Sequence, residues 1–157
     1  MKKLPGMLIV FLICLVSCHE KSQGDKETSS AKLIQGTWKL LTGTVIEKGD
    51  TTITDYTKDR SFIKIINDSH FAFLLHDLKK GKDSTAAAFT AGGGSYSLAG
   101  DSYTEHLEYC SAREWEGHDF TFTVTITSDT LVQNGIEKIE SEGINRINIE
   151  KYVRAKK

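Results

Sequence analysis

The feature of this chain that most constrains its fold is a stretch in which apolar and polar side chains alternate strictly. Residues 120–127 read Phe-Thr-Phe-Thr-Val-Thr-Ile-Thr. Successive side chains of a β-strand point to opposite faces, so this stretch puts its phenylalanines, valine and isoleucine on one face and its threonines on the other. The pattern predicts a half-buried strand of an antiparallel sheet, with one face against a core and the other against water.

Strand-like segments recur along most of the chain and are separated by short turn sequences. Turn chemistry is recognisable at residues 48–50, 67–69 and 99–102, and again near Asp129. Between the turns we expect strands at 37–47, 51–56, 62–66, 71–75, 96–98, 103–109, 120–127, 131–133 and 147–154, preceded by a short helix at 31–35. About eight to ten strands in chain order predict an all-β fold, an up-and-down antiparallel β-barrel that closes on itself. A β-sandwich is the alternative, because periodicity does not reveal closure.

The first residues of the chain have the features of an export signal. Two lysines precede an apolar run from Leu4 to Val16, which is followed by Ser17 and Cys18. A basic start, a short apolar core and a small residue before a cleavage site are typical of a secretory signal peptide. The run is too short for a membrane-spanning helix, which needs about 20 apolar residues.

The four residues Leu15-Val16-Ser17-Cys18 resemble the lipobox of bacterial lipoproteins. The resemblance implies that residues 1–17 are removed and that Cys18 carries the lipid that anchors the mature chain to a membrane. Residues 18–30 are then expected to form a flexible tether, because they offer almost no apolar side chain to bury. The expected location is the bacterial cell envelope, with the outer membrane favoured. An ordinary signal peptide with an incidental cysteine is the alternative.

The cysteine count and the charge balance narrow the classes of protein further. Of three cysteines, Cys14 lies in the expected signal peptide and Cys18 at the lipid site, which leaves Cys110 as the only thiol. No disulfide within the chain is therefore expected. The formal net charge is −1, and a nucleic-acid partner is not expected because such a partner requires a clustered basic face. Residues 31–157 have a length suited to one domain.

Gly36-Thr37-Trp38, at the expected start of the first strand, has the G-x-W form found in lipocalins. In that family the tryptophan plugs the closed end of the barrel, and an arginine from the end of the last strand lies across it. Arg154 is in the matching place, and a guanidinium over an indole is stabilised by cation–π attraction. Over residues 31–157 the chain thus resembles the lipocalin-like lipoproteins of Bacteroidetes-type bacteria. Thr54-Asp55-Tyr56 has the letters of a second lipocalin motif, but it lies too early in the chain, and we interpret it as coincidence.

The resemblance and the alternation together predict a binding site inside the barrel. In the strand expected at 103–110, the odd-numbered residues form the more apolar face, which we expect to face the interior. Glu105 would then be a carboxylate in the lumen that fixes the polar end of a ligand. The alternatives for Glu105 are bonding to a neighbouring strand or a place at the wet rim. The expected lumenal side chains are Tyr96, Tyr103, Glu105, Phe120 and Phe122, and Trp38 and Arg154 are expected to be structural.

The opposite face of the same strand presents His106, Glu108 and Cys110, which are possible metal ligands. Alternate residues of a strand lie about 6.6–6.8 Å apart, so neighbouring pairs can converge on zinc but all three rarely can. A site would need a further ligand such as His70 or His76. An exposed polar face is the favoured interpretation, no metal or other cofactor is expected, and His106 and Glu108 remain the candidates if one is bound.

Motifs for nucleophilic catalysis are not recognisable in the sequence. No G-x-S-x-G is present, and Cys110 would lie about 13 Å from His106 along one strand, too far for a hydrogen-bonded pair. The sequence therefore favours a membrane-anchored binding protein over an enzyme, with a small apolar or amphipathic molecule in the barrel lumen. The alternative is a non-enzymatic module with a filled barrel, whose surface binds a protein or another envelope component.

Overall fold

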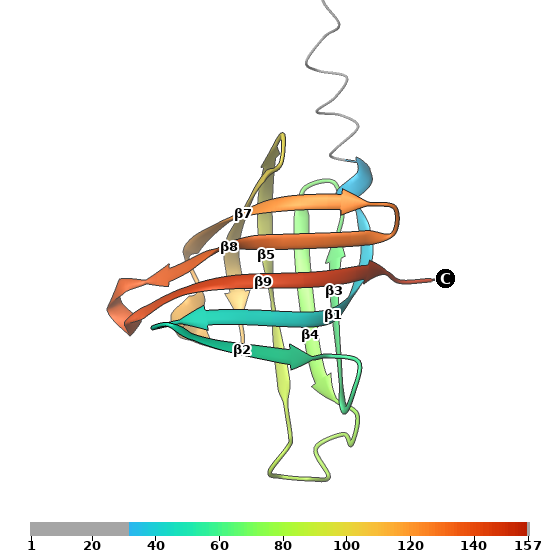
Figure 1. Ribbon diagram of the computed structural model, residues 1–157, viewed down its shortest axis with the longest axis vertical. Helices are drawn as coiled ribbons and strands as arrows, with labels where there is room; N and C mark the ends of the chain where they lie inside the picture. The colour runs from blue at the N-terminus through green and yellow to red at the C-terminus, as the bar shows by residue number, and fades with distance from the viewer. Residues whose placement is uncertain (1–31, 157) are drawn as a thin grey trace, which may run out of the picture.

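The computed structural model describes residues 32–156, and almost all of them lie in antiparallel strands (Figure 1). The elements in chain order are β1 (Gly36–Glu47), β2 (Asp50–Asp55), β3 (Arg60–Ile66), β4 (His70–Asp77), β5 (Phe89–Ala99), β6 (Ser102–Cys110), η1 (Arg113–Trp115), β7 (His118–Thr127), β8 (Thr130–Ile139), η2 (Glu140–Glu142) and β9 (Ile144–Arg154). Residues 32–34 form a helical turn before β1. In Figure 1, β7, β8, β9, β1 and β2 lie side by side in front, and β3, β4 and β5 cross behind them steeply.

The strand order shows that the sheet is a closed barrel. Consecutive strands from β3 to β9 are neighbours, and β1 pairs with both β3 and β9. The wall therefore has eight strands, β1 and β3 to β9, and β2 is an extra strand on β1. The predicted up-and-down antiparallel barrel with a short leading helix is confirmed, and the alternative of a sandwich is wrong.

At one end of the barrel, β1 pairs with the extra strand β2 instead of with β3. β2 pairs with β1 from Thr42 to Glu47, whereas β3 pairs with β1 only from Gly36 to Lys39. After β2 the chain crosses over residues 56–59 to β3, and β3 then pairs with the first residues of β1. Among the described residues the outer edge of β2 has no strand partner. The barrel is therefore fully closed near the start of β1 and more open near its end.

A β-bulge in β6 changes which of its side chains face the lumen. The pairing of β5 with β6 passes from Gly93 opposite Tyr109 directly to Gly94 opposite Leu107, so Glu108 is the inserted residue. A bulge of this kind shifts the alternation of the strand by one residue. Beyond the bulge the odd-numbered positions of β6 therefore leave the interior.

The consequences of the bulge are visible at the two residues that follow it. Tyr109 is 69% exposed, whereas Cys110 lines the interior cavity. The expectations that Tyr109 faces inward and Cys110 outward are wrong for this reason. The glycines of β5 make the bulge possible, because a Cβ atom on Gly94 would lie 2.0 Å from the carbonyl oxygen of His106.

The closed end of the barrel is built around Trp38, which is fully buried. Its Nε1 donates a hydrogen bond to the carbonyl of Ile34 at 2.7 Å. The guanidinium carbon of Arg154 lies 4.1 Å from the centre of the Trp38 rings. Both terminal nitrogens of Arg154 donate to main-chain carbonyls, those of Gln35 and Leu33, each at 2.8 Å. The arginine thus ties the leading helical turn to the last strand across the tryptophan.

The geometry of the closed end explains why the first residue of the G-x-W motif is a glycine. Gly36 has φ of +132°, and a Cβ atom there would lie 2.7 Å from Nη1 of Arg154. Only glycine adopts this backbone conformation readily and leaves room for the guanidinium. Further buried apolar side chains belong to the same core cluster as the plug, among them Leu40, Ile66, Phe71, Tyr103 and Leu131.

Candidate binding site in the barrel lumen

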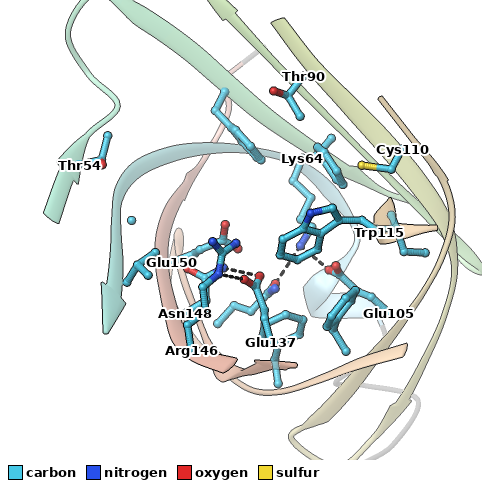
Figure 2. Close-up of a pocket in the computed structure, with 18 of the residues that line it drawn as sticks. Thr54, Lys64, Thr90, Glu105, Cys110, Trp115, Glu137, Arg146, Asn148 and Glu150 are labelled. Carbon is cyan, nitrogen blue, oxygen red and sulfur yellow. Dashed lines mark hydrogen bonds and ion pairs between the residues drawn. The ribbon is translucent and has the colours of Figure 1, made fainter. Parts of the chain in front are cut away.

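The half of the barrel away from Trp38 contains a cavity of about 290 Å³ (Figure 2). Its lining includes side chains from β1 and β3 to β9, and also Thr54 of β2 and Trp115 of η1. Small-molecule sites usually measure about 300–1,000 Å³, so the cavity lies at the lower limit of that range. The space is enough for one ring with a short chain.

Aromatic side chains form much of the cavity wall. On the β3–β4 side, the ring of Phe62 stacks on Phe73 at 5.9 Å and meets the edge of Tyr56 at 5.8 Å. On the opposite side, the ring of Trp115 packs 5.6 Å from that of Phe120. These two groups of rings give the cavity apolar walls on both sides. We call these five residues the aromatic wall.

The floor of the cavity holds a buried ion pair between β3 and β6. Lys64 is 2% exposed, and its ammonium group is paired with the carboxylate of Glu105. The same Nζ donates a hydrogen bond to Oε1 of Gln133 at 2.9 Å. It also lies 5.5–5.7 Å from three ring centres, those of Phe71, Tyr103 and Tyr152. Each buried charge therefore has a partner, which a buried ion requires.

A second ionic group lies at the mouth, between β8 and β9. Nε of Arg146 donates to one oxygen of Glu137 at 2.6 Å, and the amide of Asn148 donates to the other at 2.8 Å. The guanidinium carbon of Arg146 lies 4.9 Å from the ring centre of Trp115. Figure 2 shows this group on one side of the cavity and Lys64 with Glu105 on the other.

A third carboxylate, that of Glu150 on β9, lines the same cavity. It accepts a hydrogen bond from the hydroxyl of Tyr152 at 2.7 Å. No basic side chain among residues 32–156 lies within ion-pair distance of it. Burial raises the pKa of Glu150, an effect that the nearby ammonium of Lys64 partly opposes. Glu150 is thus the one lumenal carboxylate in the described part of the chain without a cation of its own.

The structure brings three of the five predicted lumenal residues to the cavity, namely Glu105, Phe120 and Phe122. Glu105 is bonded to a neighbouring strand, which was one of the alternatives for it. Tyr103 is buried deeper, and its hydroxyl has no hydrogen-bond partner in the described part of the chain. Tyr96 does not line the cavity: its ring packs 5.2 Å from Tyr103 and its hydroxyl donates to the carbonyl of Asn67 at 2.8 Å.

His106 and Glu108, the two favoured metal-ligand candidates, do not line the cavity and are bonded to different neighbours, whereas Cys110 faces the cavity. Nδ1 of His106 lies 2.7 Å from a carboxylate oxygen of Asp119. The carboxylate of Glu108 accepts two hydrogen bonds from Ser95, at 2.7 and 3.0 Å. Over residues 32–156 the structure contains no group of three or more His, Cys, Asp or Glu side chains that could hold a metal ion.

The charged residues that sequence reasoning missed are Lys64, Glu137, Arg146 and Glu150. Lys64 lies in the segment Phe62-Ile63-Lys64-Ile65-Ile66, which is apolar on both faces, so the alternation does not single it out. The available signal was that Lys64 shares a face with Phe62 and Ile66. In β9 the polarity is inverted: Asn148 and Glu150 line the cavity, and by alternation the isoleucines beside them face outward.

The residues expected to act at the membrane lie outside the described part of the chain. These are the signal peptide 1–17, Cys18 and the tether 18–30. In residues 32–156 no helix has the length and apolar character to cross a membrane.

Comparisons with known proteins show structural similarity but no sequence match. No protein-family model matches the chain, and no curated protein matches it. The chain is similar to a crystal structure of a variant of the fluorescent protein UnaG, with 12% sequence identity and a TM-score of 0.39. That alignment covers 80% of this chain and 99% of the other. A similarity of this size does not indicate a shared ligand.

Proposed function

We propose that this protein is a lipid-anchored barrel of the bacterial cell envelope that binds a small amphipathic molecule in the open half of its lumen. The observation that carries the binding proposal is the cavity of about 290 Å³ with an aromatic wall and a charged floor. Ligand sites typically combine apolar walls with a few polar groups that fix orientation. The lumen has both kinds of group around one cavity.

The distribution of side chains between the two ends supports a binding role. The closed half is filled by apolar residues around Trp38, as expected where packing alone is needed. The open half instead contains Lys64, Glu105, Glu137, Arg146 and Glu150 around empty volume. Charges in a lumen cost desolvation free energy, and apolar residues of similar size would serve stability as well or better. Their presence beside a cavity favours a binding role over a filled barrel that works only through its surface.

Binding can be tested by native mass spectrometry of the protein purified gently from a bacterial host, with Cys18→Ser to remove the anchor. We expect a reproducible added mass that is lost on denaturation. Val45→Trp, which places an indole in the cavity, should abolish the adduct. Val132→Trp, at an outward-facing position of β8 beside the inward-facing Gln133, is the control and should keep it. A clean protein mass, with no uptake from a lipid and metabolite extract, would instead support the surface module.

The proposed anchor and envelope location are supported by the lipobox-like sequence Leu15-Val16-Ser17-Cys18. In a host fed an alkyne-labelled fatty acid, the chain should incorporate label and fractionate with membranes. Cys18→Ser should abolish both, whereas Cys110→Ser should leave both unchanged. Unaltered labelling and fractionation in Cys18→Ser would refute the anchor and leave the binding proposal untouched.

A further inference from the structure

From the charge and ring geometry of the lumen, and resting on the proposed function, we infer that the ligand is an amphipathic amine. Its ammonium group binds the carboxylate of Glu150, and its apolar body packs against the aromatic wall.

The charge balance of the lumen is the first observation behind this inference. Three carboxylates face two cations across the cavity, and each cation already has its carboxylate. Lys64 is paired with Glu105, and Arg146 is paired with Glu137. Glu150 remains, and within residues 32–156 its carboxylate is bonded to the hydroxyl of Tyr152 and to no cation. A cationic ligand would neutralise this surplus negative charge, whereas an anionic ligand would add to it.

The way in which the lumen holds its own cations is the second observation. The ammonium of Lys64 has a carboxylate on one side and three aromatic rings within 5.7 Å. The guanidinium of Arg146 has a carboxylate on one side and the Trp115 ring on the other. Aromatic faces attract cations through their quadrupole, most strongly where water is excluded. Glu150 lines the same cavity as the aromatic wall and interacts with Tyr56, so it offers the same combination with no cation of the described chain in it.

The groups that face Glu150 also predict how its binding depends on pH. The charged or titratable groups near Glu150 are Lys64 on β3, Tyr103 and Glu105 on β6, Glu137 on β8, Tyr152 on β9, and Tyr56 just after β2. Burial raises the pKa of Glu150 despite the ammonium of Lys64. A proton and a ligand ammonium therefore compete for the same carboxylate, and amine affinity should fall as the pH falls through that pKa.

The volume of the cavity determines how large a probe molecule can be. A water molecule occupies roughly 30 Å³ in the liquid, so the cavity of about 290 Å³ takes a molecule of about ten heavy atoms. Three molecules of nearly equal shape differ in charge: 2-phenylethylamine, 2-phenylethanol and 3-phenylpropanoate. The last of these tests the rival possibility that a ligand carboxylate binds Arg146.

The experiment titrates each probe into the full chain held in phosphatidylcholine nanodiscs, with empty nanodiscs as the reference. Trp115 fluorescence reports occupancy, because Trp115 lines the cavity and Trp38 does not. Trp115→Phe should remove the signal. At pH 7.5 we expect the amine to bind at least about tenfold more tightly than the alcohol or the carboxylate, and its advantage should shrink at pH 5.

The matched variants are Glu150→Gln and Glu108→Gln, the latter on the outer face of β6. Glu150→Gln should weaken amine binding about tenfold and leave alcohol binding unchanged, and Glu108→Gln should change neither. Equal binding of amine and alcohol by the unmodified protein, or tighter binding of the carboxylate, would overturn the amine inference and leave the lumenal site standing. If none of the three probes binds and Val45→Trp behaves like the unmodified protein, the proposed binding function fails as well.

Discussion

At the scale of single residues, the stability of the lumen depends on Lys64. Its ammonium is the only cation near both Glu105 and Glu150 in the described structure. Replacing it by methionine keeps most of the volume and leaves the buried Glu105 and the half-buried Glu150 without a counter-charge. We expect Lys64→Met to lower the free energy of unfolding by about 3–5 kcal/mol, measured by urea denaturation at pH 7.

The double variant Lys64→Met with Glu105→Leu is the control for that prediction. It removes the buried pair as a unit, which is much less costly than breaking it. It should therefore be more stable than Lys64→Met alone. The same reasoning means that Glu105→Leu alone strands Lys64 and destabilises the barrel, so loss of ligand by that variant would not identify Glu105 as a ligand contact. Lys64→Met as stable as the unmodified protein would contradict the role assigned to the pair.

Glu150 makes stability depend on pH with a definite sign. Because its pKa is raised in the folded state, there is a pH window above its ordinary value in which the folded chain holds a proton that the unfolded chain has released. The stabilisation from this group is thus present at lower pH and lost as the pH rises through that window. The Glu150→Gln variant lacks this group, so in urea denaturation the unmodified protein should lose stability relative to the variant as the pH rises above the ordinary carboxyl pKa of 4.5. Parallel curves for the two proteins would contradict the raised pKa.

At the scale of strands, the bulge in β6 depends on the close approach of β5. A Cβ atom on Gly94 would meet the carbonyl oxygen of His106 at 2.0 Å and the amide nitrogen of Glu108 at 2.8 Å. Both neighbours are main-chain atoms that cannot rotate away. We expect Gly94→Ala to destabilise the protein by about 1–3 kcal/mol, measured by thermal or urea unfolding. Ser97→Ala, at an exposed position of the same strand, should stay within about 0.5 kcal/mol of the unmodified protein.

The strands also show what the sequence could and could not predict. The alternation in β7 and the turns predicted at 48–50, 67–69 and 99–102 are local signals, and they were enough to predict the barrel. The inward face of β6 was correct only up to Leu107, because the bulge results from pairing with a distant glycine-rich strand. The charged floor was missed because β3 is apolar on both faces and β9 has its polar residues inside. Sequence patterns assume an apolar interior, and that assumption fails where a lumen holds charge.

At the scale of the whole molecule, we expect a change at the closed end of the barrel to alter stability without altering binding at the open end. Arg154→Lys should lower the free energy of unfolding by about 1–3 kcal/mol, because lysine cannot cover the Trp38 rings while bonding to two carbonyls. Binding of 2-phenylethylamine should not change, since the cavity lies at the other end of the barrel. Denaturation curves and fluorescence titrations on the same preparation check both statements. A parallel loss of binding in the folded variant would show that the two ends are coupled.

Both ends of the described chain lie at the closed end of the barrel. Leu33, at the start, and Arg154, near the finish, are joined there by a hydrogen bond of 2.8 Å, whereas Trp115 and Arg146 surround the mouth. Any attachment made through either terminus therefore starts on the side away from the cavity. A barrel coupled to a sensor surface or fused to a second domain at residue 32 or residue 156 has its entrance turned toward solution. Circular joining of the two termini would likewise leave the mouth unobstructed.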